Sequence, residues 1–360
     1  MNKIYRLRQS VGIIQLEELV EFYKSNIRVG IKLKMKHQNI IELLKEFNGN
    51  KSVNEILYHN PLLEQSQLMS LVNFLNENYI LIENDIEYPQ ELVNSNYRLL
   101  NLLEDYCKST SEVLACINKI QEAKVAIIGL GAVGSNIAVQ LAQAGVGSFV
   151  IVDCDIVELS NLHRQSYFEN DVSELKVDAL SEQLHSFGAK NIVKINKKLS
   201  DINLENESSL TKVNLIINCA DEPSVDYTSE IIARHCMDHK IPHIVGGGYN
   251  LHQTLIGQTI IPYETACFNC FRIYLDSINT SELVGVKKLH RESRKLGSYP
   301  PLSGIAASLA CLDSIKLLVD KKEYLQQVNK RIEFSLRTSK IINSNVERHP
   351  QCEWCGERNG

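Results

Sequence analysis

The residues best suited to chemistry follow a short apolar run, residues 125–128, near the middle of the chain. Gly129, Gly131 and Gly134 come next in G-x-G-x-x-G spacing, and a helical pattern leads to a second apolar run that ends in Asp153. Glycines at this spacing let the backbone turn tightly and approach a phosphate, and a helix N-terminus offers unpaired N–H groups. An acid about twenty residues further on suits a ribose hydroxyl. The stretch predicts nucleotide binding, with a glycine turn that only packs as the alternative.

A second set of residues with chemical potential comes from the cysteines. Four of the ten cysteines form two C-x-x-C pairs, Cys267/Cys270 and Cys352/Cys355. In a protein of a reducing compartment such pairs indicate metal ligation rather than a disulfide framework. Four thiolates suit one tetrahedral zinc ion and leave no position open for substrate. We predict structural Zn²⁺ at these cysteines, although one C-x-x-C pair alone could be redox-active.

Composition narrows the classes of function. The chain has 360 residues and a net charge of −5, which argues against a general nucleic-acid binder. No segment approaches the roughly 20 consecutive apolar residues of a membrane span. The first residues, MNKIYRLRQS, hold no apolar signal core. We therefore expect a cytoplasmic protein with neither nucleic acid nor membrane as partner.

The elements that position these residues predict an α/β fold. Strand, glycine turn, helix and strand in succession are typical of a doubly wound, mostly parallel Rossmann-like sheet, which we expect in residues 121–360. Residues 89–120 are interpreted as a linker and an approach helix. Residues 1–88 alternate short apolar strands with three helical patterns, and Ser52 with Glu55 predicts a capping box at one helix start. The predicted N-terminal domain is a small winged-helix-like α+β unit.

The loop after Asp153 departs from an ordinary dinucleotide-binding protein. Its pattern, D-x-D-x-V/I-x-x-x-N-L-x-R-Q over residues 153–165, resembles the ThiF/MoeB branch of the ubiquitin-activating enzyme superfamily. Residues 175–180, 215–221 and 300–308 match further motifs of that family, and the two C-x-x-C pairs match its zinc site. The resemblance covers about residues 120–357.

The resemblance implies an enzyme that uses ATP to adenylate a carboxylate. It places Arg164 and Lys176 on the phosphates and Asp221 on Mg²⁺, with Asp153 on the ribose. By the same likeness, the residues beside the phosphates or the metal are Asp155 and Asn161. Relatives are dimers in which an arginine reaches across the interface, and Arg98 is the candidate for that role in an expected homodimer. Taken singly, each of these residues could instead be a surface charge or a helix cap.

The N-terminal region resembles the leader-peptide-binding domains of enzymes that modify ribosomally made peptides. Its motif is the phrase over residues 49–57, GNKSVNEIL, together with the strand and helix pattern. Such domains take an extended peptide as an added strand along an exposed edge. A winged-helix appendage for dimerisation is the alternative.

Together, the two regions resemble the enzymes that mature microcin-C-like and pantocin-like peptide antibiotics. The leading hypothesis is ATP-dependent activation of a carboxylate on a ribosomal precursor peptide, leading to a nucleotide–peptide linkage or to dehydrative cyclisation of a Glu or Asp side chain. One alternative is a sulfur-carrier-protein adenylyltransferase, against which counts the lack of cysteine in residues 271–310. Another is a non-catalytic module that presents the leader peptide.

Overall fold

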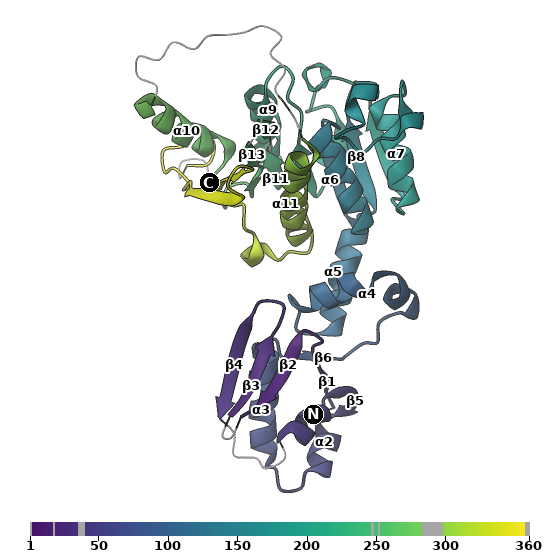
Figure 1. Ribbon diagram of the computed structural model, residues 1–360, viewed down its shortest axis with the longest axis vertical. Helices are drawn as coiled ribbons and strands as arrows, with labels where there is room; N and C mark the ends of the chain where they lie inside the picture. Colours follow the sequence, from purple (N-terminus) through teal and green to yellow (C-terminus); the bar gives the residue numbers. More distant parts are fainter. Residues whose placement is uncertain are drawn as a thin grey trace. The chain divides into compact units, whose positions relative to one another are not determined.

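The computed structural model describes residues 2–16, 19–34, 40–245, 248–250, 253–282, 297 and 299–356, with backbone only for 248–250, 253–256 and 279–282. The chain forms two compact units, residues 1–118 and residues 119–360 (Figure 1). Residues 89–118, interpreted from the sequence as linker and approach helix, pack within the first unit.

The N-terminal unit combines two antiparallel three-stranded sheets with helices. The sheets have the strand orders β5-β1-β6 and β2-β3-β4. The elements of this unit, in chain order, are β1 (Ile4–Leu7), β2 (Val11–Gln15), β3 (Leu19–Lys24), β4 (Val29–Lys34), α1 (Ile40–Lys45), β5 (Asn48–Ser52), α2 (Val53–His59), α3 (Gln65–Glu77), β6 (Leu81–Glu83), α4 (Gln90–Glu104) and α5 (Thr110–Glu122), whose last residues belong to the second unit.

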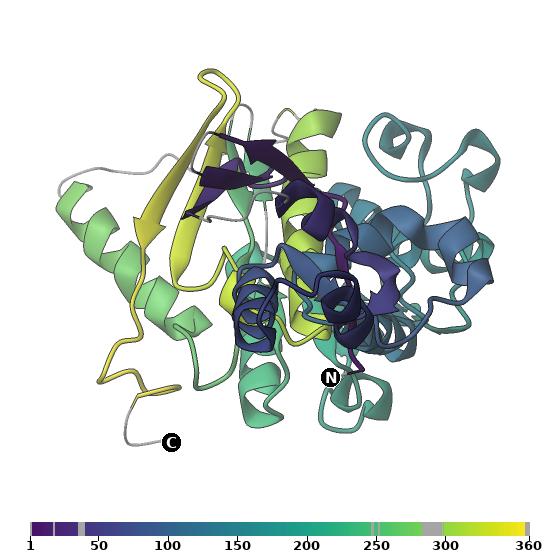
Figure 2. The same cartoon turned by 90° about the horizontal axis from the view of Figure 1, so that it is seen from below.

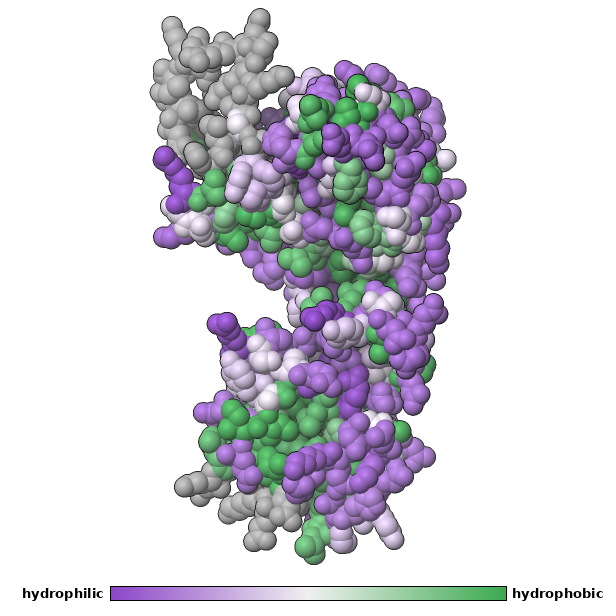
Figure 3. Space-filling model, turned by 45° about the vertical axis from the view of Figure 1, so that its right-hand side comes forward, coloured by the Kyte–Doolittle hydropathy of each residue, from purple (hydrophilic) through white to green (hydrophobic). Residues whose placement is uncertain are grey.

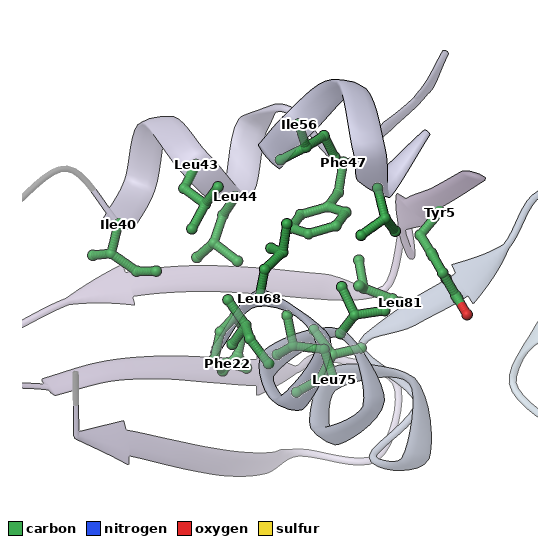
Figure 4. Packing of buried hydrophobic residues seen from close by; sticks show 14 of the residues in the cluster. Tyr5, Phe22, Ile40, Leu43, Leu44, Phe47, Ile56, Leu68, Leu75 and Leu81 are labelled. Atoms are coloured by element: carbon green, nitrogen blue, oxygen red, sulfur yellow. The ribbon is translucent and has the colours of Figure 1, made fainter. Parts of the chain in front are cut away.

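One apolar core holds the N-terminal unit together. Phe22 of β3 packs with Leu44 of α1 and with Leu68 and Leu75 of α3, all fully buried or nearly so (Figure 4). The predicted capping box is confirmed. The Ser52 hydroxyl accepts a hydrogen bond from the Glu55 backbone N–H, and the Glu55 carboxylate accepts one from the Ser52 backbone N–H. Local pattern therefore fixes the helices of this unit.

Buried charges attach the segment after β6 to the strands. Arg6 donates to both carboxylate oxygens of Glu104, and Tyr88 Oη donates to the same carboxylate at 2.9 Å. The Arg8 guanidinium, 2% exposed, donates to backbone carbonyls of Leu81 and Cys107. Since a buried guanidinium needs such partners, Arg8 ties the end of β1 to β6 and to the segment after α4.

The second unit contains a six-stranded sheet of order β14-β11-β10-β7-β8-β9, in which five strands are parallel and β14 is antiparallel. This confirms the predicted fold class. A four-stranded antiparallel sheet, β12-β13-β15-β16, accompanies it. The elements are β7 (Lys124–Ile128), α6 (Ala132–Gln143), β8 (Ser148–Val152), α7 (Lys176–Ser186), β9 (Asn191–Ile195), α8 (Ser208–Thr211), β10 (Leu215–Asn218), α9 (Val225–Asp238), β11 (His243–Val245), β12 (Gly248–Asn250), β13 (Gln253–Ile256), β14 (Gln258–Ile260), α10 (Phe268–Glu282), α11 (Pro300–Leu318), β15 (Lys330–Ser335) and β16 (Lys340–Asn345).

The order of the parallel strands locates the crevice of the sheet. The chain runs from β7 outward to β8 and β9 on one side, and later from β10 to β11 on the other. The connections therefore diverge between β7 and β10, and a ligand crevice forms at the carboxyl ends of strands at such a point. β7, β8 and β10 are almost wholly buried because their sequences are continuous apolar runs.

Helix α11 is long and apolar enough, by length and composition alone, to cross a membrane, which qualifies the expectation drawn from the sequence. It packs against α6 (Figures 1 and 2). Its buried Asp313 accepts hydrogen bonds from the Thr259 hydroxyl at 2.9 Å and from the Gln327 backbone N–H at 3.0 Å. Its packing against α6 and its buried apolar residues, among them Leu302, Ala306 and Leu317, account for its apolar sequence as that of a helix in the core of the domain.

His243 on β11 makes the stability of the fold sensitive to acid. The ring is fully buried, Nδ1 donates to the Ile241 carbonyl at 3.0 Å, and Nε2 has no hydrogen-bond partner in the described part of the chain. Burial lowers the pKa of His243 to about 4, and the neighbouring His235 contributes to the decrease. The unfolded chain therefore binds a proton more readily between the two pKa values, and stability present above about pH 6.5 is lost as the pH falls toward 4.

We expect the free energy of unfolding to fall by about 2 kcal/mol between about pH 7.5 and pH 5 through this group alone. The measurement is urea unfolding of the wild type and His243→Leu at both pH values. The variant should show a smaller pH dependence by that amount. Equal pH dependence of the two proteins would exclude His243 as the cause.

Candidate active site and cysteine cluster

The glycine turn lies at the crevice between β7 and β10. Gly129 has φ +85°, and a Cβ there would lie 2.6 Å from the Ala220 backbone nitrogen. A Cβ on Gly134 would lie 1.9 Å from the Gly129 carbonyl oxygen. A Cβ on Gly131, in contrast, would meet no atom of the described residues within 4 Å. The first and third glycines are therefore required by packing of the turn itself, whereas the second leaves the N-terminus of α6 accessible to a ligand.

Asp153 at the end of β8 is bonded to this turn. Its Oδ2 accepts from the Leu130 backbone N–H at 2.6 Å, and its Oδ1 accepts from the Asp155 N–H at 2.8 Å. Burial raises the pKa of the Asp153 carboxyl, and the nearby Lys176 ammonium partly opposes that rise. Asp153 therefore holds the glycine turn in place through these bonds. It also lies at the end of β8, where the sequence predicts a contact with the ribose.

Lys176 is a buried cation in the same cluster, with 5% of its surface exposed. Its Nζ lies 2.7 Å from Asp155 Oδ2 and 3.9 Å from Asp153 Oδ1. The backbone holds it there, because Lys176 N donates to the Asp155 carbonyl at 3.0 Å and Val157 N donates to the Glu174 carbonyl at 2.8 Å. The alternative of a solvated surface lysine is thereby excluded.

Asp221 follows β10 at the same edge of the sheet. Desolvation raises the pKa of its carboxyl, the adjacent Glu222 adds to the rise, and the Lys176 ammonium partly opposes it. Asn218, which the sequence analysis left without a role, holds this strand end. Its buried amide donates to the hydroxyls of Thr228 and Ser229, both at 3.3 Å. A polar residue closing an apolar strand was the signal for it.

A tyrosine also missing from the sequence analysis holds the loop after Asp153 over the turn. Tyr167 Oη, in a buried side chain, donates to the Leu130 carbonyl at 2.9 Å. Next to it, the Ser166 N–H donates to Ser135 Oγ on α6 at 3.1 Å. These bonds join segments far apart in sequence, and no local pattern marks them.

Arg164 and Asn161 bond within their own turn. The Arg164 guanidinium donates to the Ser160 carbonyl at 2.9 Å, and Asn161 Oδ1 accepts from the Glu158 N–H at 3.1 Å. Among the described residues, the structure bonds neither side chain to Lys176 or Asp221. Their roles beside phosphates or metal stay predictions.

Arg98 lies on α4 in the N-terminal unit, and its side chain is exposed. Its guanidinium lies 5.4 Å from the ring centroid of Tyr97. The role of Arg98 across a dimer likewise stays a prediction.

The four predicted cysteines come together. All are buried, and their sulfur atoms lie within 4.8 Å of one another. Neighbouring sulfurs are 3.4–3.8 Å apart, and a tetrahedron with Zn–S bonds of about 2.3 Å has edges of about 3.8 Å. The His349 backbone N–H points at Cys270 Sγ over 3.3 Å, as expected for a thiolate acceptor. The donor set and its geometry fit a tetrahedral zinc ion.

This geometry can be compared with known proteins. Residues 106–354 match the ThiF family, which is more than half of the chain. The chain belongs to the ThiF family. Molybdopterin-synthase adenylyltransferase of Escherichia coli K12 is 26% identical over 242 residues, or 66% of this chain and 89% of that protein. The E. coli sulfur carrier protein ThiS adenylyltransferase is 28% identical over 202 residues, or 56% and 74%. As a ThiF-type protein with such relatives, the chain is an ATP-dependent adenylyltransferase.

Solved structures resemble both units of the chain. Crystalline E. coli MccB with succinimide has a TM-score of 0.78 and 23% identity, and the likeness covers 98% of this chain and 99% of that one. PaaA gives a TM-score of 0.71 at 20% identity over 95% and 100%. At these identities the likeness establishes the fold, including that of the N-terminal unit.

Proposed function

We propose that this ThiF-family enzyme activates a carboxylate on a ribosomally made precursor peptide, on the way to a modified peptide antibiotic. The observation that carries the proposal is the buried Lys176, paired with Asp155 beside a glycine turn whose middle position is open. The whole-chain likeness to MccB supports a peptide substrate, since one MccB structure is described as a microcin C7 biosynthetic enzyme in complex with N-formylated MccA.

Adenylation builds up negative charge on the phosphates of ATP, and Lys176 and the N-terminus of α6 are proposed to stabilise it. A carboxylate oxygen of the peptide attacks the α-phosphorus of ATP, the bond from that phosphorus to the bridging oxygen breaks, and pyrophosphate leaves with the electron pair. Negative charge grows on the phosphates, so a fixed cation lowers the barrier. Lys176 would supply that cation when its contact with Asp155 yields to phosphate, and the N-terminus of α6 would supply N–H donors. Arg164 would join it by turning from the Ser160 carbonyl.

Two metals belong to the proposal. Mg²⁺ takes few carboxylates and keeps phosphate oxygens and water, so Asp221 would hold it, with Asp155 and Asn161 nearby. Asp221 is exposed just after β10, so its carboxylate is accessible to such an ion. Zinc at the four cysteines would be structural, because four thiolates fill a tetrahedral ion.

The N-terminal unit is proposed to bind the leader part of the peptide. On the face in Figure 3, hydrophobic residues gather on this unit. Its exposed large hydrophobic side chains on and beside the β2-β3-β4 sheet include Ile14, Leu16, Tyr23, Ile27 and Val29. Such a surface suits an extended peptide added to a sheet edge. A cytoplasmic homodimer, with Arg98 reaching the partner's nucleotide, completes the proposal.

A sulfur-carrier-protein adenylyltransferase is the second candidate, favoured by the relatives among molybdopterin-synthase and ThiS adenylyltransferases. The ThiF match begins at residue 106, so the N-terminal unit lies almost wholly outside it. A carrier-protein enzyme gives no reason for that unit. A non-catalytic presenting module gives no reason for burying Lys176 against two acids.

The test is pyrophosphate release from ATP·Mg by the full chain. One arm adds a ribosomal precursor peptide with its leader, a second adds the same peptide without the leader, and a third adds a carrier protein ending in Gly-Gly. We expect release with the complete peptide only. Release with the carrier alone would replace the proposal by the second candidate, and no release in any arm would favour the presenting module.

A further inference from the structure

Asn269, the second of the two residues between Cys267 and Cys270, makes a contact that zinc ligation by the four cysteines does not require. Its side chain is 5% exposed, and its Nδ2 lies 3.3 Å from Cys352 Sγ, a distance typical of an N–H···S hydrogen bond. The contact joins the start of α10 to the C-terminal cysteine pair, 83 residues further along the chain.

The orientation of this amide is fixed by chemistry. Arg272 Nη2 donates to Asn269 Oδ1 at 2.7 Å, and a guanidinium has donors only, so the oxygen of the amide must face it. The NH2 group is therefore the end that faces Cys352. Arg272 is held in turn, because its Nη1 donates to Glu230 Oε2 on α9 at 3.1 Å.

Charge explains why such a contact matters. Four thiolates around one divalent ion leave a net charge of about −2, and buried negative charge requires donors and cations around it. Arg272 polarises the Asn269 amide and so strengthens its bond to sulfur. Arg234 and Arg272 also approach the Trp354 ring of the second C-x-x-C pair, at 4.3 and 6.0 Å from its centroid.

We propose that Asn269, oriented by Arg272, is a positioning residue that stabilises the Cys352 thiolate and thereby tightens the hold of the cysteine cluster on its metal ion. The inference rests on the proposed zinc site, and it is independent of the peptide substrate. Groups that orient metal ligands change metal affinity by about 10–100-fold when removed.

The experiment compares the wild-type full chain, Asn269→Ala, Arg272→Met and the control Ser277→Ala, loaded with Co²⁺ or Zn²⁺. Ser277 is an exposed residue of α10 whose hydroxyl donates, among the described residues, to the Tyr274 carbonyl in its own helix. Competition with a chromophoric chelator measures affinity, and the thiolate-to-cobalt charge-transfer band reports the electron density on sulfur.

Asn269→Ala should weaken zinc binding about 10–100-fold and move the charge-transfer band to longer wavelength, because a thiolate without its donor gives up an electron more readily. Arg272→Met, at a half-exposed position that tolerates change, should move both readouts in the same direction by less. Ser277→Ala should leave both unchanged. If neither Asn269→Ala nor Arg272→Met moves the charge-transfer band of the wild type, the inference is wrong. If the cobalt-loaded wild type shows no thiolate-to-cobalt band at all, the proposed zinc site itself is wrong.

Discussion

Replacing Lys176 by methionine is expected to reduce peptide-dependent pyrophosphate release by about 10²–10³-fold, the usual effect of removing one fixed group that stabilises transition-state charge. Methionine keeps the volume of the lysine stem, so the start of α7 should remain packed. The measurement is pyrophosphate release under saturating ATP·Mg, with ATP affinity determined separately by calorimetry.

Lys194 provides a matched control for this variant. Its Nζ lies 2.6 Å from Asp178 Oδ1, as close as Lys176 lies to Asp155, yet its side chain is 46% exposed against 6% for Lys176. Exposed ion pairs contribute little, so Lys194→Met should release pyrophosphate at the wild-type rate. If Lys176→Met unfolds like the wild type and keeps full activity, Lys176 does not act in the reaction and the proposed function loses its main support.

The predicted parts of the site are those that local sequence determines. The run before Gly129 is apolar at every position, so a buried parallel strand was foreseeable, and the glycine spacing required the turn after it. The two C-x-x-C pairs carried their chemistry in their spacing. The resemblance placed Lys176 on the phosphates, but its burial was not predicted, because a lone lysine at a helix start has no local mark of burial.

The parts that could not be predicted depend on contacts between distant segments. Tyr167 bonds to Leu130, 37 positions earlier in the chain, and Asn269 bonds to Cys352, so neither contact has a periodic pattern. Arg8 is buried and donates to the carbonyls of Leu81 and Cys107, far along the chain, and no local pattern marks a basic residue for burial. Arg164 was predicted on a phosphate, and in the structure its guanidinium donates to a carbonyl of its own turn.

Two glycines of the turn are expected to serve different purposes, Gly134 the folding of the chain and Gly131 the binding of the nucleotide. In Gly134→Ala the new methyl would lie 1.9 Å from the Gly129 carbonyl oxygen and 3.0 Å from its carbonyl carbon, so the backbone must move. We expect a loss of at least about 3 kcal/mol in the free energy of unfolding, measured by urea denaturation, because both contacts are with backbone atoms.

Gly131→Ala should instead weaken ATP binding and leave the stability of the fold nearly unchanged. Gly131 has φ −73°, which alanine adopts freely, and no atom in the part of the chain that the structure describes lies within 4 Å of the added methyl, so stability should stay within about 1 kcal/mol of the wild type. The methyl would nevertheless occupy the approach to the N–H groups at the start of α6, and ATP affinity should fall at least about tenfold by calorimetry. If Gly131→Ala binds ATP as tightly as the wild type, the phosphates do not lie over this turn. The lysine–acid cluster would then need another explanation, because its cation would face no triphosphate.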